Sequence, residues 1–476
     1  MTKLALPVLA VAAILIAAGA VGWGVAGALV PRGRLWLAER VAWGFATGMA
    51  LVAGSVALAF SLHAVPGWLP FLLLSALVVL PARFLRLRER AAGLTIRRLS
   101  QVSALLLAIL VLGVALYALK ALTEPMWAND YVAIWGFKGK TFFFERRIPD
   151  RLFRWLALSF SHPEYPLGLP FLYSGIAFLL GRWDDHAMAL LFPFVQAATL
   201  LALFGWLRRR GAGRELALAA AALLSFFEPL YRAFTTGMAE VPLSFGLLLL
   251  GTSVCDRLDR TDTGASRRVV LASVVCTATK NEGLYFVAMA FALAAALSLS
   301  RKGFAARAAA MLALPAVLVV AAHRLIRGSL PLRDFDFSLL SRPGLLAPRL
   351  KESVAAVIAE TPVAAWIGMA ALVVLLVAGR DSAPGERLLA LAACGLGAYV
   401  LLPALAVRGP AWLIGTAFFR TLAALAPLVT AGAAARLIPL WPEPAGASFG
   451  GSTGSAGGPA ASAANPGRPT LSTRES

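Results

Sequence analysis

The sequence predicts an all-α polytopic membrane protein, a transmembrane helical bundle of about 13 spans with a large outer-face loop that contains interfacial helices. The first observation is composition: hydrophobic residues make up 59% of the 476 residues and charged residues only 14%. Soluble domains are roughly a quarter charged. The second observation is that the apolar residues gather in runs of about the 20 residues that a helix needs to cross a bilayer.

Most of these runs are candidate spans. The first is too long for the apolar core of a signal peptide, so we expect a retained helix. Leu167–Leu180 is apolar but only 14 residues long, below the ~17 needed to cross, so we expect an interfacial or re-entrant helix there. The candidate spans are residues 5–30, 41–62, 66–82, 101–122, 186–207, 215–232, 238–255, 269–280, 283–299, 307–325, 361–379, 388–407 and 412–435.

The positive charge predicts the topology. Much of the net charge of +20 lies in short arginine clusters between the spans, so a nucleic-acid partner is not needed to explain it. Because basic connections stay in the cytoplasm, we expect the tail inside and both the amino terminus and the loop 123–165 outside. The clusters are residues 31–40, 83–100, 208–214, 256–268, 301–307 and 380–387.

Three regions follow from this pattern. Residues 1–100 are expected to form a transmembrane scaffold extension, and residues 101–437 the working transmembrane region, with an outer loop over 123–185. Residues 438–476 are rich in Gly, Ser, Ala and Pro and are expected to form a disordered cytoplasmic tail. The three cysteines are scattered in or beside apolar runs, so we expect neither disulfides nor a zinc site.

The stretch from Glu124 to Pro170 mixes acids, bases and aromatic residues between two apolar regions. Asp130 lies in it among Trp127, Tyr131 and Trp135. A carboxylate beside aromatic rings at a membrane surface is partly desolvated, which raises its basicity and suits it to deprotonating a hydroxyl. The alternative is an N-cap for a helix that starts at Tyr131.

Two further acids lie near the same membrane edge. Glu240 in GMAEVPL opens an otherwise apolar helix, where an ionisable group is costly and usually functional. Its alternative role is to N-cap that helix. Glu124 is a weaker candidate for substrate binding, because its alternative role is simply that of a solvated acid at the end of a helix.

Cations supply the candidate anion-binding residues. Lys138 and Lys140 share a predicted helix and either bind phosphate or extend to lipid headgroups. Lys280 lies in the break TATKNEG, and Arg420 lies within the last span. A charge in a span needs a partner, which is either a lipid phosphate or a nearby acid such as Glu282 or Glu240.

Two more features belong to the outer face. His162 in SHPEYP is a candidate substrate contact, and its alternative role is structural, in a turn that the two prolines fix. The other histidines are distant in sequence, so we expect no metal site there. The outer loop 326–360 and its edges carry an excess of basic residues that the topology does not explain and that an anionic substrate does: Arg324, Arg327, Arg333, Arg342, Arg349 and Lys351.

The order of these motifs resembles the GT-C superfamily of polytopic membrane glycosyltransferases, in particular bacterial members related to the dolichyl-phosphate-mannose mannosyltransferase and aminoarabinose transferase group. The motifs are WANDYVAIWGFKGK, HPEYPLGLPFLYSGIAFLLG, GMAEVPL, KNEG and FFRTLAALAP. The resemblance covers about residues 101–437.

This resemblance implies transfer of a sugar from a polyprenyl-phosphate donor to a glycan, lipid or protein acceptor at the periplasmic or exterior face of the inner (plasma) membrane. Asp130 would match the family's first-loop acid and Glu240 a second acidic position, with Lys280 and Arg420 suited to the donor phosphate. Family members often carry paired acids in the first loop, whereas Asn129 precedes Asp130 here. The identity of the base and a divalent-cation requirement therefore stay open.

Two other functions fit the same sequence. Broken helices and charges at membrane depth are also features of transporters, so a transporter or a lipid-linked-glycan flippase is one alternative. A non-catalytic subunit of envelope polysaccharide assembly is the other. Concentration of the charged residues at one membrane face favours the enzyme.

Overall fold

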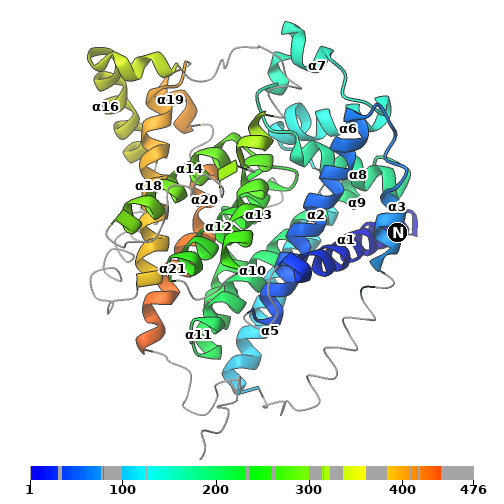
Figure 1. Ribbon diagram of the computed structural model, residues 1–476, viewed down its shortest axis with the longest axis horizontal. Helices are drawn as coiled ribbons and strands as arrows, with labels where there is room; N and C mark the ends of the chain where they lie inside the picture. Colours follow the sequence, from blue (N-terminus) through cyan, green and yellow to red (C-terminus); the bar gives the residue numbers. More distant parts are fainter. Residues whose placement is uncertain are drawn as a thin grey trace, which may run out of the picture. The chain divides into compact units, whose positions relative to one another are not determined.

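The computed structural model describes residues 2–29, 35–76, 79, 99–124, 126–231, 235–259, 264–299, 313–314, 316–321, 336–360, 383–407, 409–415 and 419–440. Within these ranges the chain is almost entirely helical and has no strand (Figure 1). The helices up to the first large loop are α1 (Thr2–Leu29), α2 (Leu37–Ser61), α3 (Leu69–Leu74) and α5 (Gln101–Thr123).

The segment between α5 and α10, predicted as the outer loop, consists of short helical elements. A π-helical turn, η1 (Tyr131–Trp135), runs directly into α6 (Gly136–Glu145). The loop continues through α7 (Arg151–Arg154), the 3₁₀ turn η2 (Leu156–Ser161), α8 (Gly168–Leu180) and α9 (Asp185–Met188). Helix α8 has 13 residues, so the predicted short helix is confirmed, and it packs against α2 and α6.

The second half of the chain supplies the centre of the bundle. Its main helices are α10 (Leu191–Arg209), α11 (Arg214–Ser225), α12 (Glu240–Leu258), α13 (Ala265–Thr279), α14 (Asn281–Leu299), α16 (Pro343–Glu360), α18 (Ala383–Ala404) and α21 (Ala426–Leu437). The shorter elements are η4 (Phe337–Ser341), α19 (Pro410–Leu413), α20 (Phe419–Ala423) and η6 (Ile438–Leu440).

Six described helices are long and apolar enough to cross a membrane. They are Ala5–Gly27, Leu37–Ser61, Gln101–Thr123, Asp185–Arg209, Glu240–Leu258 and Pro384–Ala404. This confirms the all-helical class and is consistent, by helix length and composition, with a membrane protein, whereas the 13 spans and the outward orientation of the loop stay predictions.

Several predicted spans differ from the structure. The run 215–232 contains α11, which has only 12 residues. The run 412–435 is broken among α19, α20 and α21. The runs 66–82 and 307–325 are described only in part, whereas 361–379 and the tail from residue 441 lie outside the described residues.

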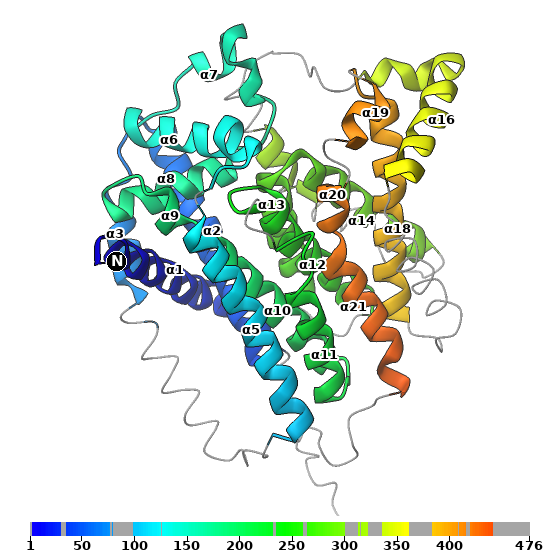
Figure 2. The ribbon, with the colours of Figure 1, turned by 180° about the vertical axis from the view of Figure 1, so that it is seen from behind.

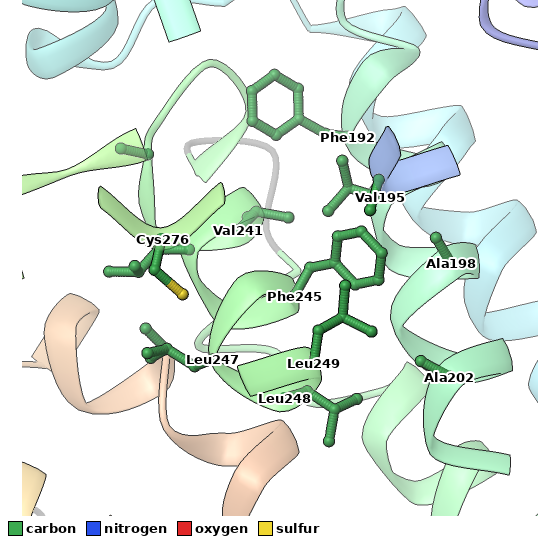
Figure 3. Close-up of a cluster of buried hydrophobic side chains, with 14 of the residues drawn as sticks. Phe192, Val195, Ala198, Ala202, Val241, Phe245, Leu247, Leu248, Leu249 and Cys276 are labelled. Atoms are coloured by element: carbon green, nitrogen blue, oxygen red, sulfur yellow. The ribbon is translucent and has the colours of Figure 1, made fainter. Parts of the chain in front are cut away.

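Helix α12 occupies the centre of the bundle and packs against α10, α13, α14 and α21 (Figures 1 and 2). The apolar window of α12 is 83% buried, against 17% for α5, so α5 is the helix that presents most of its surface outward. Figure 3 shows Phe245 and Leu249 of α12 directed toward Val195 and Ala198 of α10. Close packing on this scale stabilises the helices that carry the polar groups described below, through van der Waals contacts between side chains.

Helices α1 and α2 cross at very short distance. A Cβ on Gly48 would lie 2.0 Å from the carbonyl oxygen of Ala18, and one on Gly22 would lie 2.1 Å from that of Gly44. Glycine at these positions is therefore needed for the close helix–helix contact. The N-terminal residues also pack on α8 and α10, so they belong to the same compact unit, Met1–Pro442, as the rest of the described chain.

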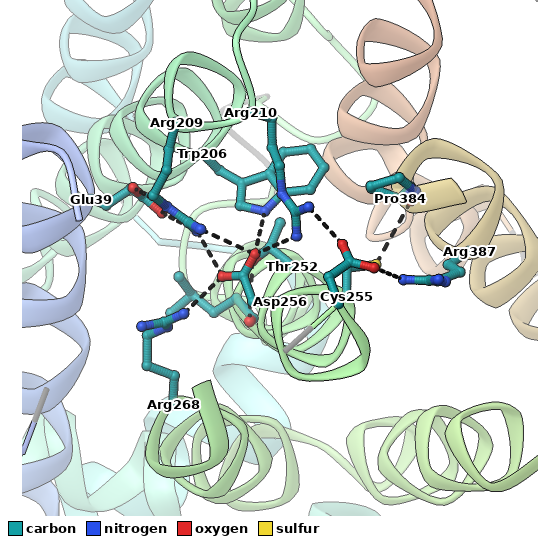
Figure 4. Close-up of polar contacts among 12 residues, drawn as sticks. Glu39, Trp206, Arg209, Arg210, Thr252, Cys255, Asp256, Arg268, Pro384 and Arg387 are labelled. Atoms are coloured by element: carbon teal, nitrogen blue, oxygen red, sulfur yellow. Dashed lines mark hydrogen bonds and ion pairs between the residues drawn. The ribbon is translucent and has the colours of Figure 1, made fainter. Parts of the chain in front are cut away.

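A cluster of ion pairs connects five helices at the opposite end of α12 from Glu240. Asp256 accepts hydrogen bonds from Arg209, Arg210 and Arg268, as Figure 4 shows. Arg209 also pairs with Glu39 of α2 at 2.9 Å, and Arg210 and Arg387 both pair with Asp259. These arginines, expected only to set topology, thus also join α2, α10, α12, α13 and α18.

Candidate functional site

Asp130 and Arg420 form an ion pair although 290 residues separate them in the chain. Arg420 Nη1 of α20 donates to Asp130 Oδ2 at 2.8 Å, and the two side chains are 20% and 22% exposed. Asp130 itself has helical dihedral angles and makes no side-chain capping hydrogen bond. The alternative prediction that Asp130 caps the helix starting at Tyr131 is therefore wrong.

Behind this pair lies a buried group of three charges. Lys280 Nζ is 3.0 Å from Glu240 Oε1 and 2.8 Å from Glu282 Oε1. The Lys280 and Glu240 side chains are only 3% and 2% exposed. Arg420 Nη1 lies 4.0 Å from Glu240 Oε1 and so connects the two groups. We call Asp130, Arg420, Glu240, Lys280 and Glu282 the charged row.

The backbone around TATKNEG explains how Lys280 reaches this position. Lys280 is extended, with φ −154° and ψ 155°, between the last residue of α13 and the first of α14. A Cβ on Gly283 would lie 2.0 Å from the Cys276 carbonyl oxygen, so glycine permits the tight reversal. The predicted helix break is confirmed. The acids that the sequence suggested as structural partners are the ones that bind the lysine.

The start of α12 is held by two tyrosines. Gly237 has φ +96°, and a Cβ there would lie 2.7 Å from the ring of Tyr131. Tyr173 Oη donates to the Gly237 carbonyl at 2.9 Å, and Tyr131 Oη donates to Asp185. Glu240 follows this turn as the first residue of α12, whose N-cap is Ala239. These contacts hold the turn at Gly237 against Tyr131 and Tyr173, three residues before Glu240.

Sequence reasoning missed Asp185 and Gly237. In the sequence, Asp185 looks like a helix-capping residue, and its neighbour Asp184 does cap α9 by accepting a hydrogen bond from the Ala187 N–H. For Gly237, the sequence shows only a glycine shortly before the start of a helix. Neither signal names the distant Tyr131 as the partner.

The HPEYP segment forms a stacked group next to the charged row. His162 Nδ1 lies 2.7 Å from Glu164 Oε1. The His162 ring stacks on Tyr165 at 4.9 Å between centroids, and Tyr165 stacks on Trp135 at 5.2 Å. Tyr165 also lies within electrostatic range of Arg420. The predicted turn before α8 is confirmed.

Lys138 has a different environment from the one that a phosphate-binding lysine needs. Its side chain is fully buried, and Nζ donates to the His162 carbonyl at 2.6 Å. His162 has φ 49°, in the left-handed region, which this hydrogen bond helps to maintain. Burial lowers the pKa of Lys138 to about 7, and the nearby Glu164 carboxylate partly offsets this effect. We infer that Lys138 positions the His162 turn.

The remaining candidates lie apart from the charged row. Glu124 and Lys140 are exposed. Arg349 donates to the carbonyl oxygens of Ala404 and Ala406 at the end of α18. Arg342 and Lys351 are exposed, and the other outer-loop arginines, Arg324, Arg327 and Arg333, lie outside the described residues.

An apolar cavity of about 360 Å³ lies among α2, α8, α10, α12 and α13. Two of its lining residues are near the charged row in the sequence: Thr279 directly precedes Lys280, and Pro242 is two residues after Glu240. Phe192, Val195 and Phe245, labelled in Figure 3, also line it. Its walls are almost wholly hydrocarbon, which suits an apolar ligand.

The arrangement therefore combines a partly exposed acid–base pair with an apolar cavity. No group of three or more His, Cys, Asp and Glu side chains arranged as metal ligands occurs in the part of the chain that the structure describes. Comparison with protein-family models, curated proteins and solved structures finds no match. The resemblance to GT-C glycosyltransferases thus stays a hypothesis that the motifs carry.

Proposed function

We propose that this protein is a membrane glycosyltransferase that moves a sugar from a polyprenyl-phosphate-linked donor to an acceptor hydroxyl at the outer face. The observation that carries the proposal is the partly exposed Asp130–Arg420 pair, connected through Glu240 to Lys280, the residue directly after Thr279 of the apolar cavity. A lipid-linked sugar phosphate has the same two parts: an anionic, reactive head and a hydrocarbon chain.

Arg420 is the residue suited to the donor phosphate. Its guanidinium is partly exposed, whereas the Lys280 ammonium is buried between two carboxylates. Arginine binds phosphate oxygens with two parallel hydrogen bonds. A phosphate that enters this site competes with Asp130 for the guanidinium. Donor binding therefore releases the Asp130 carboxylate to accept a hydrogen bond from the acceptor hydroxyl.

The transfer step then follows as a direct displacement. Asp130 takes the acceptor proton while the acceptor oxygen bonds to the anomeric carbon. The bond from that carbon to the phosphate oxygen breaks, and its electron pair leaves with the polyprenyl phosphate, whose growing charge Arg420 stabilises. The configuration at the anomeric carbon inverts. Glu240 acts as a positioning residue, since it lies 4.0 Å from Arg420 and is buried.

A variant of Asp130 tests this proposal. If the proposal is right, we expect cells that lack the protein to accumulate the unused lipid-linked sugar and the wild-type gene to clear it. We expect Asp130→Asn to reduce clearance by a factor of about 10²–10⁴, the usual contribution of a general base. Asp150→Asn is the matched control, because Asp150 is an exposed acid of the same loop with only a 3.8 Å pair to Arg154. Full clearance by Asp130→Asn would refute the proposal.

A lipid-linked-glycan flippase is the second candidate, because the cavity reaches exposed positions on a candidate span. A flippase moves the lipid-linked sugar across proteoliposomes without an acceptor. We expect the purified wild-type protein to leave such lipids in their original leaflet. Movement that Asp130→Asn retains would favour the flippase.

A further inference from the structure

Helix α2 supplies more of the cavity wall than any other element. It contributes Phe45 and Met49 together with small residues along one face. Those small residues are Ala46, Ala50, Ala53, Gly54 and Ala57. Residues spaced by three or four positions share a helix face, and larger side chains there would fill the space. The N-terminal region thus borders the cavity directly.

The cavity reaches the surface along the same helix. Gly54, Leu58 and Ser61 line it and are exposed, Leu58 by 56%. Leu37–Ser61 is one of the candidate membrane spans, so this opening lies on a helix that is long and apolar enough to face lipid. Val319 of the described segment 316–321 also lines the cavity. A hydrocarbon chain can enter from the bilayer through such an opening.

Two lining residues are next in sequence to the groups described above: Thr279 precedes Lys280, and Pro166 follows Tyr165. We therefore expect a molecule whose chain lies in the cavity to place an anionic head toward the cations of the charged row. Charge and polarity together select an amphiphile with a phosphate head.

We propose that α2 is the wall that selects the hydrocarbon chain of the polyprenyl-phosphate donor. This inference rests on the proposed function for the identity of the head group. Because bilayer lipid is as apolar as the cavity, entry of the chain brings little hydrophobic free energy. Fit against the small residues of α2 decides which chain enters.

Gly54→Phe tests the inference. A Cβ at Gly54 meets no atom within 4 Å, so a side chain can begin there without a clash, and we expect its phenyl ring to occupy the opening. The probe is undecaprenyl phosphate with a photoactivatable group in the isoprene units next to the phosphate, and mass spectrometry maps the cross-linked residues. We expect the label on α2 and on residues 166–172 in the wild-type protein.

In Gly54→Phe we expect the yield on these segments to fall about tenfold, since the phenyl group blocks entry. Ala57→Phe, which lies deeper along the same face, should give the same loss. Ala108→Phe on the exposed face of α5 is the matched control and should label as the wild type does. Unchanged labelling in both α2 variants would overturn the inference.

Competition separates the donor chain from ordinary lipid. An excess of phosphatidylglycerol should leave the label on α2, whereas equal competition by it would mean that the cavity holds bilayer lipid only and would overturn the inference. The cross-linking requires no sugar transfer. If the label lies on α2 while Asp130→Asn still clears the lipid-linked sugar, the chain-binding wall stands and the proposed enzyme activity fails.

Discussion

Replacement of Lys280 by methionine is expected to cause a large loss of stability. The Lys280 ammonium lies 3.0 Å from Glu240 and 2.8 Å from Glu282, and Lys280 and Glu240 are almost fully buried. Without the lysine, the nearest cation to Glu240 among the described residues is Arg420, at 4.0 Å. Removal of one partner from a buried ion pair typically costs about 3–5 kcal/mol, because the other charge stays buried and unpaired.

Variants of Glu240, the partner of Lys280, show how much of this loss comes from the pair. In Glu240→Gln the lysine keeps its contact with Glu282, so we expect a smaller loss of about 1–3 kcal/mol. The double variant Glu240→Gln with Lys280→Met has a neutral amide beside an apolar chain. It should be more stable than Lys280→Met alone, with a coupling of about 0.5–3 kcal/mol between the two positions.

The assay is the fraction of purified protein that stays monodisperse in one detergent after heating over a range of temperatures. Lys120→Met is the matched control, because this lysine is exposed at the end of α5. If Lys280→Met behaves like Lys120→Met, or if the double variant loses the sum of the single losses, Lys280 and Glu240 do not form a coupled electrostatic unit.

Two further results are expected. Arg420→Ala should weaken the binding of undecaprenyl phosphate about tenfold or more, because one charge-assisted contact with the phosphate is lost. Arg420→Lys should restore part of the affinity, since lysine keeps the positive charge. Equal binding by the wild type and both variants in an equilibrium titration would show that Arg420 does not bind the phosphate. The pKa of Lys138 is lowered to about 7 in the folded protein, against an ordinary value of 10.5 in the unfolded chain. Between these two pH values the unfolded chain holds a proton on Lys138 that the folded chain does not. Lys138 therefore makes the free energy of unfolding rise with pH, by up to ~1.4 kcal/mol per pH unit. The stability difference between wild type and Lys138→Met should rise over this range in thermal-unfolding measurements, and a difference independent of pH would contradict the burial argument.

The sequence predicted the long helices well, because a long apolar run in a membrane must satisfy its backbone hydrogen bonds within itself, and an α-helix does so. The run 101–122 corresponds to α5, Gln101–Thr123, almost to the residue. The run 412–435 did not form one helix: Pro427 lies at the start of α21, and the chain before it is divided into short turns. Composition alone cannot show such breaks, because the tertiary contacts that stabilise them come from distant helices.

The pairing of Lys280 with Glu240 and Glu282 was predictable, since a charge within an apolar region requires a partner and these two acids are near the same membrane edge in the sequence scheme. The pairing of Arg420 with Asp130 was not predicted. The burial of Lys138 was not predictable, because a lysine between aromatic residues extends to water as readily as it bonds a buried carbonyl. The arginines beside Asp256 were explained by topology alone, and the structure adds a second role as ion-pair partners. In each case the missing information was the identity of a neighbour far away in the chain.

The most direct measurement is a structure of the protein in a lipid nanodisc with undecaprenyl phosphate bound. We expect the phosphate oxygens to accept hydrogen bonds from Arg420, the Asp130 carboxylate to have left that guanidinium, and the chain to run along α2 through the apolar cavity. A phosphate bound elsewhere, with the Asp130–Arg420 pair intact and the cavity free of the chain, would contradict the account.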